Sequence, residues 1–157
     1  MRVTFLFGQK AKEFLLRFFV AFAALFLLVE AIKLPFLYEA IASFEAAALS
    51  SFGIAAVSQG AFIHATNASF EIVAECSGLV MVSMLAALLF ASKAKNSLQW
   101  LVAGGVFLFL FNLLRLFATL YAGVAWGPYA LDVVHALLWF VDAGVVVAIW
   151  GKAEKFW

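Results

Sequence analysis

The sequence predicts an all-α integral membrane protein with about four transmembrane helices, an outer interfacial amphipathic helix and a small extracytoplasmic β-hairpin. Of its 157 residues, 68% are hydrophobic and only 12% are charged, and the mean hydropathy is +1.11. Soluble domains are about half apolar and a quarter charged. We therefore expect one polytopic membrane domain over residues 1–157, in which any active site is built from helix ends and short loops.

Four apolar stretches approach the roughly 20 residues that a spanning helix requires. They cover about residues 14–32, 77–91, 98–121 and 131–150. The first stretch is longer than the apolar core of a signal peptide, and Glu30, Lys33 and Pro35 follow it in place of a small-residue cleavage site. We therefore expect a retained anchor rather than a cleaved leader.

Lysines indicate how the four spans are oriented. Basic residues precede the first span, separate the second from the third and follow the fourth, at Lys10, Lys12, Lys93, Lys95, Lys152 and Lys155. With four spans all of these lysines fall on one side, which the positive-inside rule identifies as cytoplasmic. The sequence thus predicts a multi-pass protein of the cell membrane with both termini inside, and with residues 33–76 and 122–130 on the extracytoplasmic face.

Two segments between the first and second spans lack the continuous apolar pattern of a spanning helix. Apolar residues recur every three or four positions in about residues 34–53, which predicts an amphipathic helix in the outer interface. A fifth span is the alternative, but it would move Lys93 and Lys95 to the outside. Within about residues 57–73, the runs Ala61–His64 and Ser69–Val73 flank a turn-forming segment, which predicts a two-stranded hairpin.

Cys76 is the only cysteine in the chain. One thiol cannot form an internal disulfide, which excludes membrane enzymes that work through paired thiols. A lone cysteine in an apolar chain is most often a small buried hydrophobe. The predicted topology, however, places Cys76, Arg115 and His135 at the same extracytoplasmic depth on three different spans, an arrangement that packing alone does not explain.

This combination of side chains suits a thiol nucleophile. A thiol attacks as a thiolate and needs a base, for which His135 is the main candidate and His64 of the hairpin the weaker one. Arg115 stays protonated, so it can stabilise negative charge; the alternative is an arginine that extends toward the headgroups. Asn112, one turn before it, can orient the guanidinium.

Asp132 lies one turn before His135 and can accept a hydrogen bond from its ring. A metal site formed by Cys76, Asp132 and His135 would lack recognisable ligand spacing, so we expect no metal and no cofactor. The chain also has no basic tract interleaved with aromatic residues, and we expect no nucleic-acid partner.

Three motifs resemble those of exosortases and archaeosortases. Ala74-Glu75-Cys76-Ser77-Gly78 is similar to a signature that more often reads Glu-Ala-Cys-Ser-Gly. Phe111–Leu116 is similar to the family's asparagine-x-x-arginine helix, and Asp132–His135 to its histidine helix, in the same order. The resemblance covers about residues 44–143. The run at residues 136–139 departs from it, because the glycine expected after the histidine is missing.

The resemblance implies a short, archaeosortase-like cysteine transpeptidase or protease. Such an enzyme would cleave the C-terminal sorting tail of surface proteins through a thioester, then transfer them to a membrane lipid or another surface acceptor. It implies catalytic roles for Cys76, Arg115 and His135, with Asn112, Asp132 and Glu75 supporting them. The competing interpretation is a non-catalytic membrane subunit or a small transporter, in which Arg115, Asp132 and Asp142 form a structural network or polar path.

Overall fold

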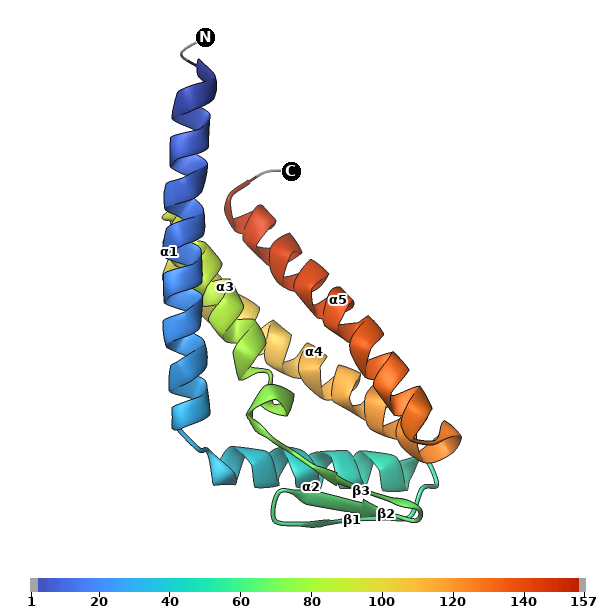
Figure 1. Cartoon of the computed structure of the whole chain (residues 1–157). Helices are drawn as coiled ribbons and strands as arrows, with labels where there is room; N and C mark the ends of the chain where they lie inside the picture. Colours follow the sequence, from blue (N-terminus) through green and yellow to red (C-terminus); the bar gives the residue numbers. More distant parts are fainter. Residues whose placement is uncertain (1–2, 156–157) are drawn as a thin grey trace.

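The structure is a computed structural model that describes the backbone of residues 3–155 and the side chains of residues 10–155. Long helices dominate it, and one small sheet lies at the end of the helical bundle (Figure 1). In chain order the elements are α1 (Val3–Ala31), α2 (Pro35–Ser51), β1 (Ala56–Gln59), β2 (Phe62–Ala65), β3 (Ala68–Glu71), the 3₁₀ turn η1 (Ala74–Ser77), α3 (Leu79–Ser92), α4 (Ser97–Trp126) and α5 (Pro128–Ala153).

Three helices are long and apolar enough to cross a membrane. They are the Lys10–Ala31 part of α1, the whole of α4 and the whole of α5. The apolar helix α3 has 14 residues, so it rises only about 21 Å at 1.5 Å per residue, whereas the hydrocarbon core is about 30 Å thick. The second predicted span is therefore present as a helix that is too short for a full crossing by itself.

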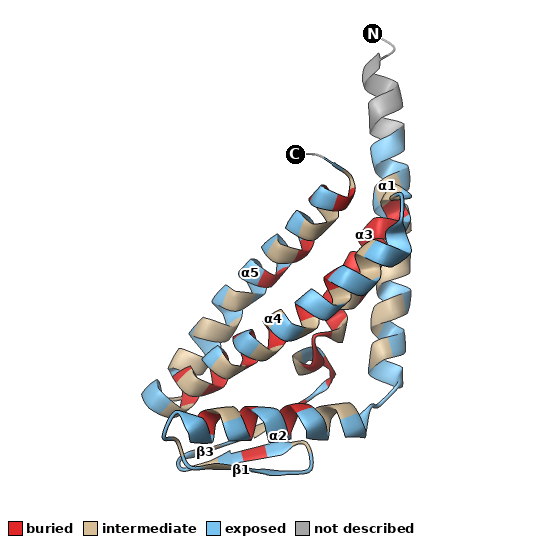
Figure 2. Cartoon of the chain, turned by 180° about the vertical axis from the view of Figure 1, so that it is seen from behind, coloured by how far each residue is buried: buried red, intermediate tan, exposed pale blue. Residues whose placement is uncertain are grey.

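Helix α3 lies at the centre of the bundle, where it packs against α1, α4 and α5 (Figure 1). Leu85 of α3, Leu108 of α4 and Val146 of α5 are completely buried in the cluster that joins these helices. Buried positions face the inside of the bundle, while the outer sides of the long helices are largely exposed (Figure 2). Leu27 and Phe140 are among the large apolar residues on that outer surface, as expected of a surface that meets lipid.

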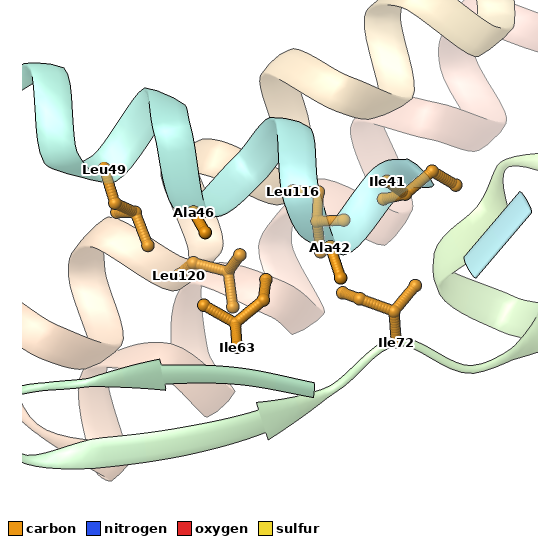
Figure 3. Close-up of a cluster of buried hydrophobic side chains, with 8 residues drawn as sticks. All are labelled: Ile41, Ala42, Ala46, Leu49, Ile63, Ile72, Leu116 and Leu120. Carbon is orange, nitrogen blue, oxygen red and sulfur yellow. The ribbon is translucent and has the colours of Figure 1, made fainter. Parts of the chain in front are cut away.

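Helix α2 lies across one end of the bundle, and we call this region, α2 with β1–β3 and η1, the sheet end (Figure 1). Pro35 occupies the first turn of α2, where its missing N–H costs nothing. Gly53, with φ of +83°, follows its last turn, as a glycine stop requires. The buried side of α2 packs between the sheet and α4 through Ile41, Ala42, Ala46, Leu49, Ile63, Ile72, Leu116 and Leu120 (Figure 3).

The sheet has three antiparallel strands in the order β1-β2-β3. Strands β2 and β3 are the two strands of the predicted hairpin, and they pair Ile63 with Phe70. Strand β1 was not predicted. Its sequence, Ala-Val-Ser-Gln, is short and mostly exposed, so no alternation of apolar and polar residues marks it; it pairs with β2 across a turn that contains Gly60 at φ +59°.

The predicted loop over residues 122–130 is almost absent. Helix α4 continues to Trp126, and α5 begins at Pro128, so Gly127 alone connects them with φ of +90°. Proline is pre-organised for the first turn of a helix, which explains this abrupt restart. A Cβ on Gly123 would lie 2.7 Å from Leu131, so the absence of a side chain there lets α5 fold back closely along α4.

Candidate active site

Cys76 lies in η1, the single 3₁₀ turn that joins the sheet to α3. Its backbone N–H donates to the carbonyl oxygen of Val73 at 3.0 Å, and its side chain is half-buried. The next turn is closed by Gly78, which has φ of +78°, a conformation that favours glycine. The Glu-Cys-Ser-Gly motif thus forms a tight strand-to-helix corner that presents the thiol at the sheet end.

Asn112 connects this corner to α4. Its side chain is completely buried, and its Nδ2 donates a hydrogen bond to the carbonyl oxygen of Cys76 at 2.7 Å. Its Oδ1 accepts from Nη1 of Arg115 at 3.3 Å. One amide therefore fixes the backbone at the thiol and also orients the guanidinium, as the spacing of Asn112 and Arg115 predicted.

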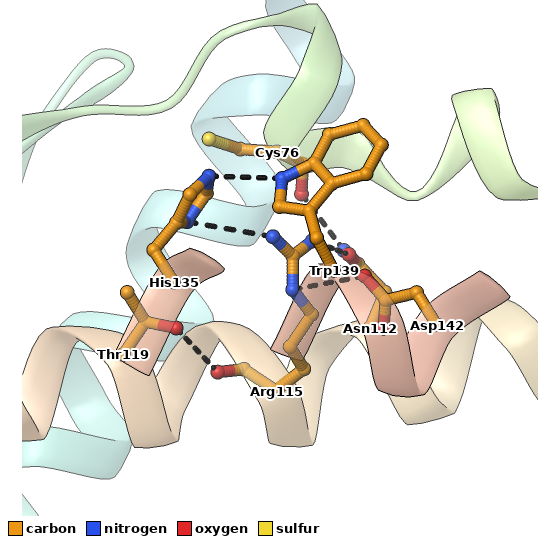
Figure 4. Close-up of polar contacts among 7 residues, drawn as sticks. All are labelled: Cys76, Asn112, Arg115, Thr119, His135, Trp139 and Asp142. Carbon is orange, nitrogen blue, oxygen red and sulfur yellow. Dashed lines mark hydrogen bonds and ion pairs between the residues drawn. The ribbon is translucent and has the colours of Figure 1, made fainter. Parts of the chain in front are cut away.

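Arg115 is surrounded by polar and aromatic partners although it belongs to an apolar helix (Figure 4). Its Nε lies 3.1 Å from Oδ2 of Asp142 in an ion pair whose two side chains are almost fully buried. Its Nη2 lies 3.4 Å from Nδ1 of His135, and its guanidinium carbon lies 5.7 Å from the centre of the Trp139 ring. The guanidinium is thus held in the protein interior and does not extend toward the headgroups.

His135 contacts a donor at each ring nitrogen. Nδ1 faces Arg115, and Nε2 accepts from the indole N–H of Trp139 at 3.0 Å. In Figure 4 His135 and Trp139 lie against the guanidinium of Arg115, and Cys76 joins the group through its backbone carbonyl, which Asn112 contacts. Within the described residues no hydrogen bond joins the thiol of Cys76 to the ring of His135.

The other residues suggested by the sequence lie further from this group. Asp132 is exposed and, among the described residues, makes no hydrogen bond with the ring of His135. Glu75 is also exposed, next to Cys76. His64 lies in β2, where its Nδ1 is 3.0 Å from the hydroxyl of Ser69. No group of three metal-binding side chains occurs in the described part of the chain.

Sequence reasoning did not single out Trp139, and Asp142 entered it only as part of a structural network or a polar path. Trp139 lies one turn after His135, where a tryptophan in an apolar helix gives no sign of a polar role. Thr119, also not singled out, donates to the backbone oxygen of Arg115 at 3.1 Å. For Trp139 and Thr119 the four-residue spacings from His135 and Arg115 are the only signal that the sequence offered.

The geometry joins three motifs that lie far apart in the chain, and the family comparison covers all of them. A family model described as transmembrane exosortase (Exosortase_EpsH) matches residues 2–151. The chain belongs to the exosortase family. No curated protein and no solved structure gave a match. Membership of this family suggests a membrane transpeptidase.

Burial determines the direction of the pKa shift at Cys76. Burial raises the pKa of the Cys76 thiol above its ordinary value, and the nearby charge of Glu75 adds to the increase. A hydrogen bond to the backbone of Val73 and the positive charge of Arg115 lower the pKa, but burial outweighs them. The thiol therefore keeps its proton at neutral pH until a base removes it.

A cavity of about 490 Å³ opens at the sheet end of the exosortase, and its lining includes Glu75, the residue before Cys76. It lies between the end of α1, the start of α2 and the segment that leads from β3 into η1. Its lining carries the carboxylates of Glu30, Glu71 and Glu75 against the single ammonium group of Lys33. The cavity therefore carries more carboxylate than ammonium groups, along the segment that leads to Cys76.

Proposed function

We propose that the chain is a membrane-embedded cysteine transpeptidase or protease of the archaeosortase type. It cleaves the C-terminal sorting tail of surface proteins and transfers them to a lipid or another surface acceptor. The observation that carries the proposal is that Asn112 joins the backbone of Cys76 to Arg115, whose guanidinium faces His135, so that η1, α4 and α5 are linked by these contacts. A nucleophile, a charge stabiliser and a base are what acyl transfer requires.

The proposed reaction begins when His135 takes the thiol proton and Sγ of Cys76 attacks the carbonyl carbon at the cleavage site. A C–S bond forms, and the carbonyl oxygen becomes an oxyanion. Arg115 has five N–H donors, and Asp142, Asn112 and His135 each face one of its nitrogens. One N–H on each terminal nitrogen is left to stabilise the oxyanion.

Collapse of this intermediate breaks the C–N bond, and the amine of the tail leaves with the proton from His135. The surface protein remains attached to Cys76 as a thioester. An amine or hydroxyl of the acceptor then attacks the thioester carbon, gives its proton to His135 and displaces the thiolate. The net reaction is transpeptidation, or proteolysis when water is the acceptor.

The proposal places the site on the extracytoplasmic face of the cell membrane, with four spans and both termini in the cytoplasm. The lysines on one side of the predicted topology support this orientation. Reporter fusions after Ala94 and after Lys155 test it. An extracytoplasmic signal at either position would overturn the orientation and the external site.

The second candidate is a non-catalytic membrane subunit or a small transporter, which the buried Arg115–Asp142 ion pair favours. The two functions differ on Cys76, which only the enzyme needs. The test is co-expression with candidate tail-bearing surface proteins, with tail loss followed in membranes. Cys76→Ala should abolish tail cleavage and preserve substrate binding. A wild-type cleavage rate in this variant would favour the second candidate.

Two further variants separate the roles within the site. His135→Ala should leave a slow thiol whose rate recovers partly at high pH, where hydroxide replaces the base. Arg115→Lys should lose about 100- to 1000-fold in rate, since a flexible ammonium group does not reproduce the planar guanidinium. An acyl-enzyme on Cys76, trapped and identified by mass spectrometry, would support the thioester directly.

A further inference from the structure

The two contacts of the His135 ring are in conflict. Arg115 and Trp139 can only donate hydrogen bonds, and they face Nδ1 at 3.4 Å and Nε2 at 3.0 Å. A neutral imidazole has one accepting nitrogen, and an imidazolium has none. Only one of the two contacts can therefore be a hydrogen bond at any time, and the shorter one to Trp139 has the better length.

This arrangement leaves the base of the proposed reaction without a free lone pair. If Nδ1 carries the proton, the indole of Trp139 occupies the lone pair of Nε2; if Nε2 carries it, Arg115 occupies the lone pair of Nδ1. A general base must be within hydrogen-bond reach of the proton that it removes. Among the described residues, the thiol of Cys76 makes no such contact with the ring.

Trp139 is the partner of the ring that can move. Arg115 is held by a buried ion pair and by Asn112. The side chain of Trp139 is 43% exposed, and it lies one turn beyond His135 on the same helix. A rotation of the indole would therefore disturb little packing, and it would release Nε2.

We propose that Trp139 caps the base: its indole N–H occupies Nε2 of His135 in the resting site, and the entering substrate segment displaces it. The freed Nε2 then takes the thiol proton, so that the S–H bond breaks, an N–H bond forms, and a thiolate faces an imidazolium. Trp139 is thus a positioning residue that keeps the thiol unreactive until substrate is present. The inference rests on the proposed function, because it assigns His135 as the base.

The test uses the full chain in lipid nanodiscs and needs no substrate. Iodoacetamide alkylates Cys76, the only thiol in the chain, and the second-order rate is measured from pH 6 to 10. Trp139→Phe removes the N–H and keeps an aromatic ring over Arg115. Losing one hydrogen bond of ordinary strength changes an equilibrium about three- to tenfold. We therefore expect the alkylation rate of Cys76 to rise by that factor at neutral pH.

The pH profile identifies the route of activation. In Trp139→Phe the pH profile of the rate should gain a step from the freed imidazole, and adding His135→Ala should abolish both the step and the acceleration. Trp126→Phe is the matched control, because Trp126 is an exposed tryptophan at the end of α4, and it should alkylate as the wild type does. An unchanged rate in Trp139→Phe, or an acceleration that survives His135→Ala, would overturn the inference.

A second measurement covers the case in which Trp139→Phe folds poorly. In ¹⁵N-tryptophan-labelled protein the indole N–H resonance of Trp139 should shift on His135→Ala, since that variant lacks the ring that accepts its hydrogen bond. A Trp139 resonance that His135→Ala leaves unchanged would also overturn the cap. If the proposed function is wrong, a different result is expected: tail cleavage then does not depend on Cys76.

Discussion

Nε of Arg115 and Oδ2 of Asp142 lie 3.1 Å apart in an ion pair that is almost fully buried between α4 and α5. A charge in a membrane helix is costly unless it is paired. The pair therefore explains how Arg115, to which we assign a catalytic role, is held inside an apolar bundle. It also ties the position of the guanidinium to the packing of two helices.

The first prediction concerns this pair. Asp142→Ala leaves an uncompensated buried charge, and removing one partner of such a pair typically destabilises a protein by about 3–5 kcal/mol. We expect a clear fall in the melting temperature of the detergent-solubilised protein, followed by circular dichroism. The double variant Arg115→Met, Asp142→Leu should recover most of the stability and no tail cleavage. If Asp142→Ala has the melting temperature of the wild type, the pair does not stabilise the bundle.

The second prediction uses two glycines with the same backbone conformation. Gly78 and Gly53 have φ of +78° and +83°, but a Cβ would lie 3.0 Å from the Asn112 side chain at Gly78 and meet nothing within 4 Å at Gly53. Alanine at either position adds strain of about 1 kcal/mol or more. Gly78→Ala should in addition displace Asn112 from the carbonyl of Cys76 and slow tail cleavage about tenfold. Equal cleavage rates in the two variants would contradict this role of Asn112.

The third prediction concerns the charge of the cavity whose lining reaches Glu75, next to Cys76. A trimethylammonium methanethiosulfonate that reaches the thiol through this cavity should modify it about fivefold faster than the sulfonate reagent, each rate being divided by that reagent's rate with a free thiol in solution, because carboxylates outnumber ammonium groups in the lining. Glu71→Gln should reduce this ratio, and so should added salt. Glu39→Gln, which alters an exposed residue outside the cavity lining, is the control. A ratio of one, or a ratio that Glu71→Gln leaves unchanged, would show that the reagents reach the thiol by another route.

Part of this architecture could be predicted because membranes penalise polar groups so strongly. Long apolar runs indicated α1, α4 and α5, and the depth of Cys76, Arg115 and His135 indicated that three segments meet. The link from Asn112 to Arg115 followed from helical spacing alone. These features depend on periodicity and on the cost of burying charge, which a sequence displays directly.

Other features depend on tertiary packing that no local pattern records. Trp139 lies in an apolar stretch and therefore resembles a lipid-facing residue. Only the fold brings its indole to the ring of His135. Asp132 has the spacing of a histidine partner, yet it is exposed, while the ring contacts Arg115 and Trp139. The sequence did not predict the short connection at Gly127, because Ala122–Trp126 is compatible with either a loop or a continued helix.

The last prediction concerns Glu45, a completely buried residue of α2. Within the described residues, neither oxygen of its carboxyl has a hydrogen-bond partner, and burial raises the pKa from 4.5 to about 7. Between these two values the folded protein keeps a proton that the unfolded chain releases. Stability should therefore fall as pH rises from about 4.5 to 7 and level off above that, with a loss of up to about 3 kcal/mol.

Glu45→Gln should remove this pH dependence, because an amide does not titrate. We expect the melting temperature of the wild type to fall by about 5 to 10 °C more than that of the variant between pH 5 and 7.5. Glu39→Gln, on the exposed side of the same helix, should keep the wild-type slope, since an exposed carboxylate is solvated in both states. Every other titrating group contributes equally to the wild type and to Glu45→Gln, so parallel slopes for these two proteins would mean that Glu45 is ionised and solvated in the folded state.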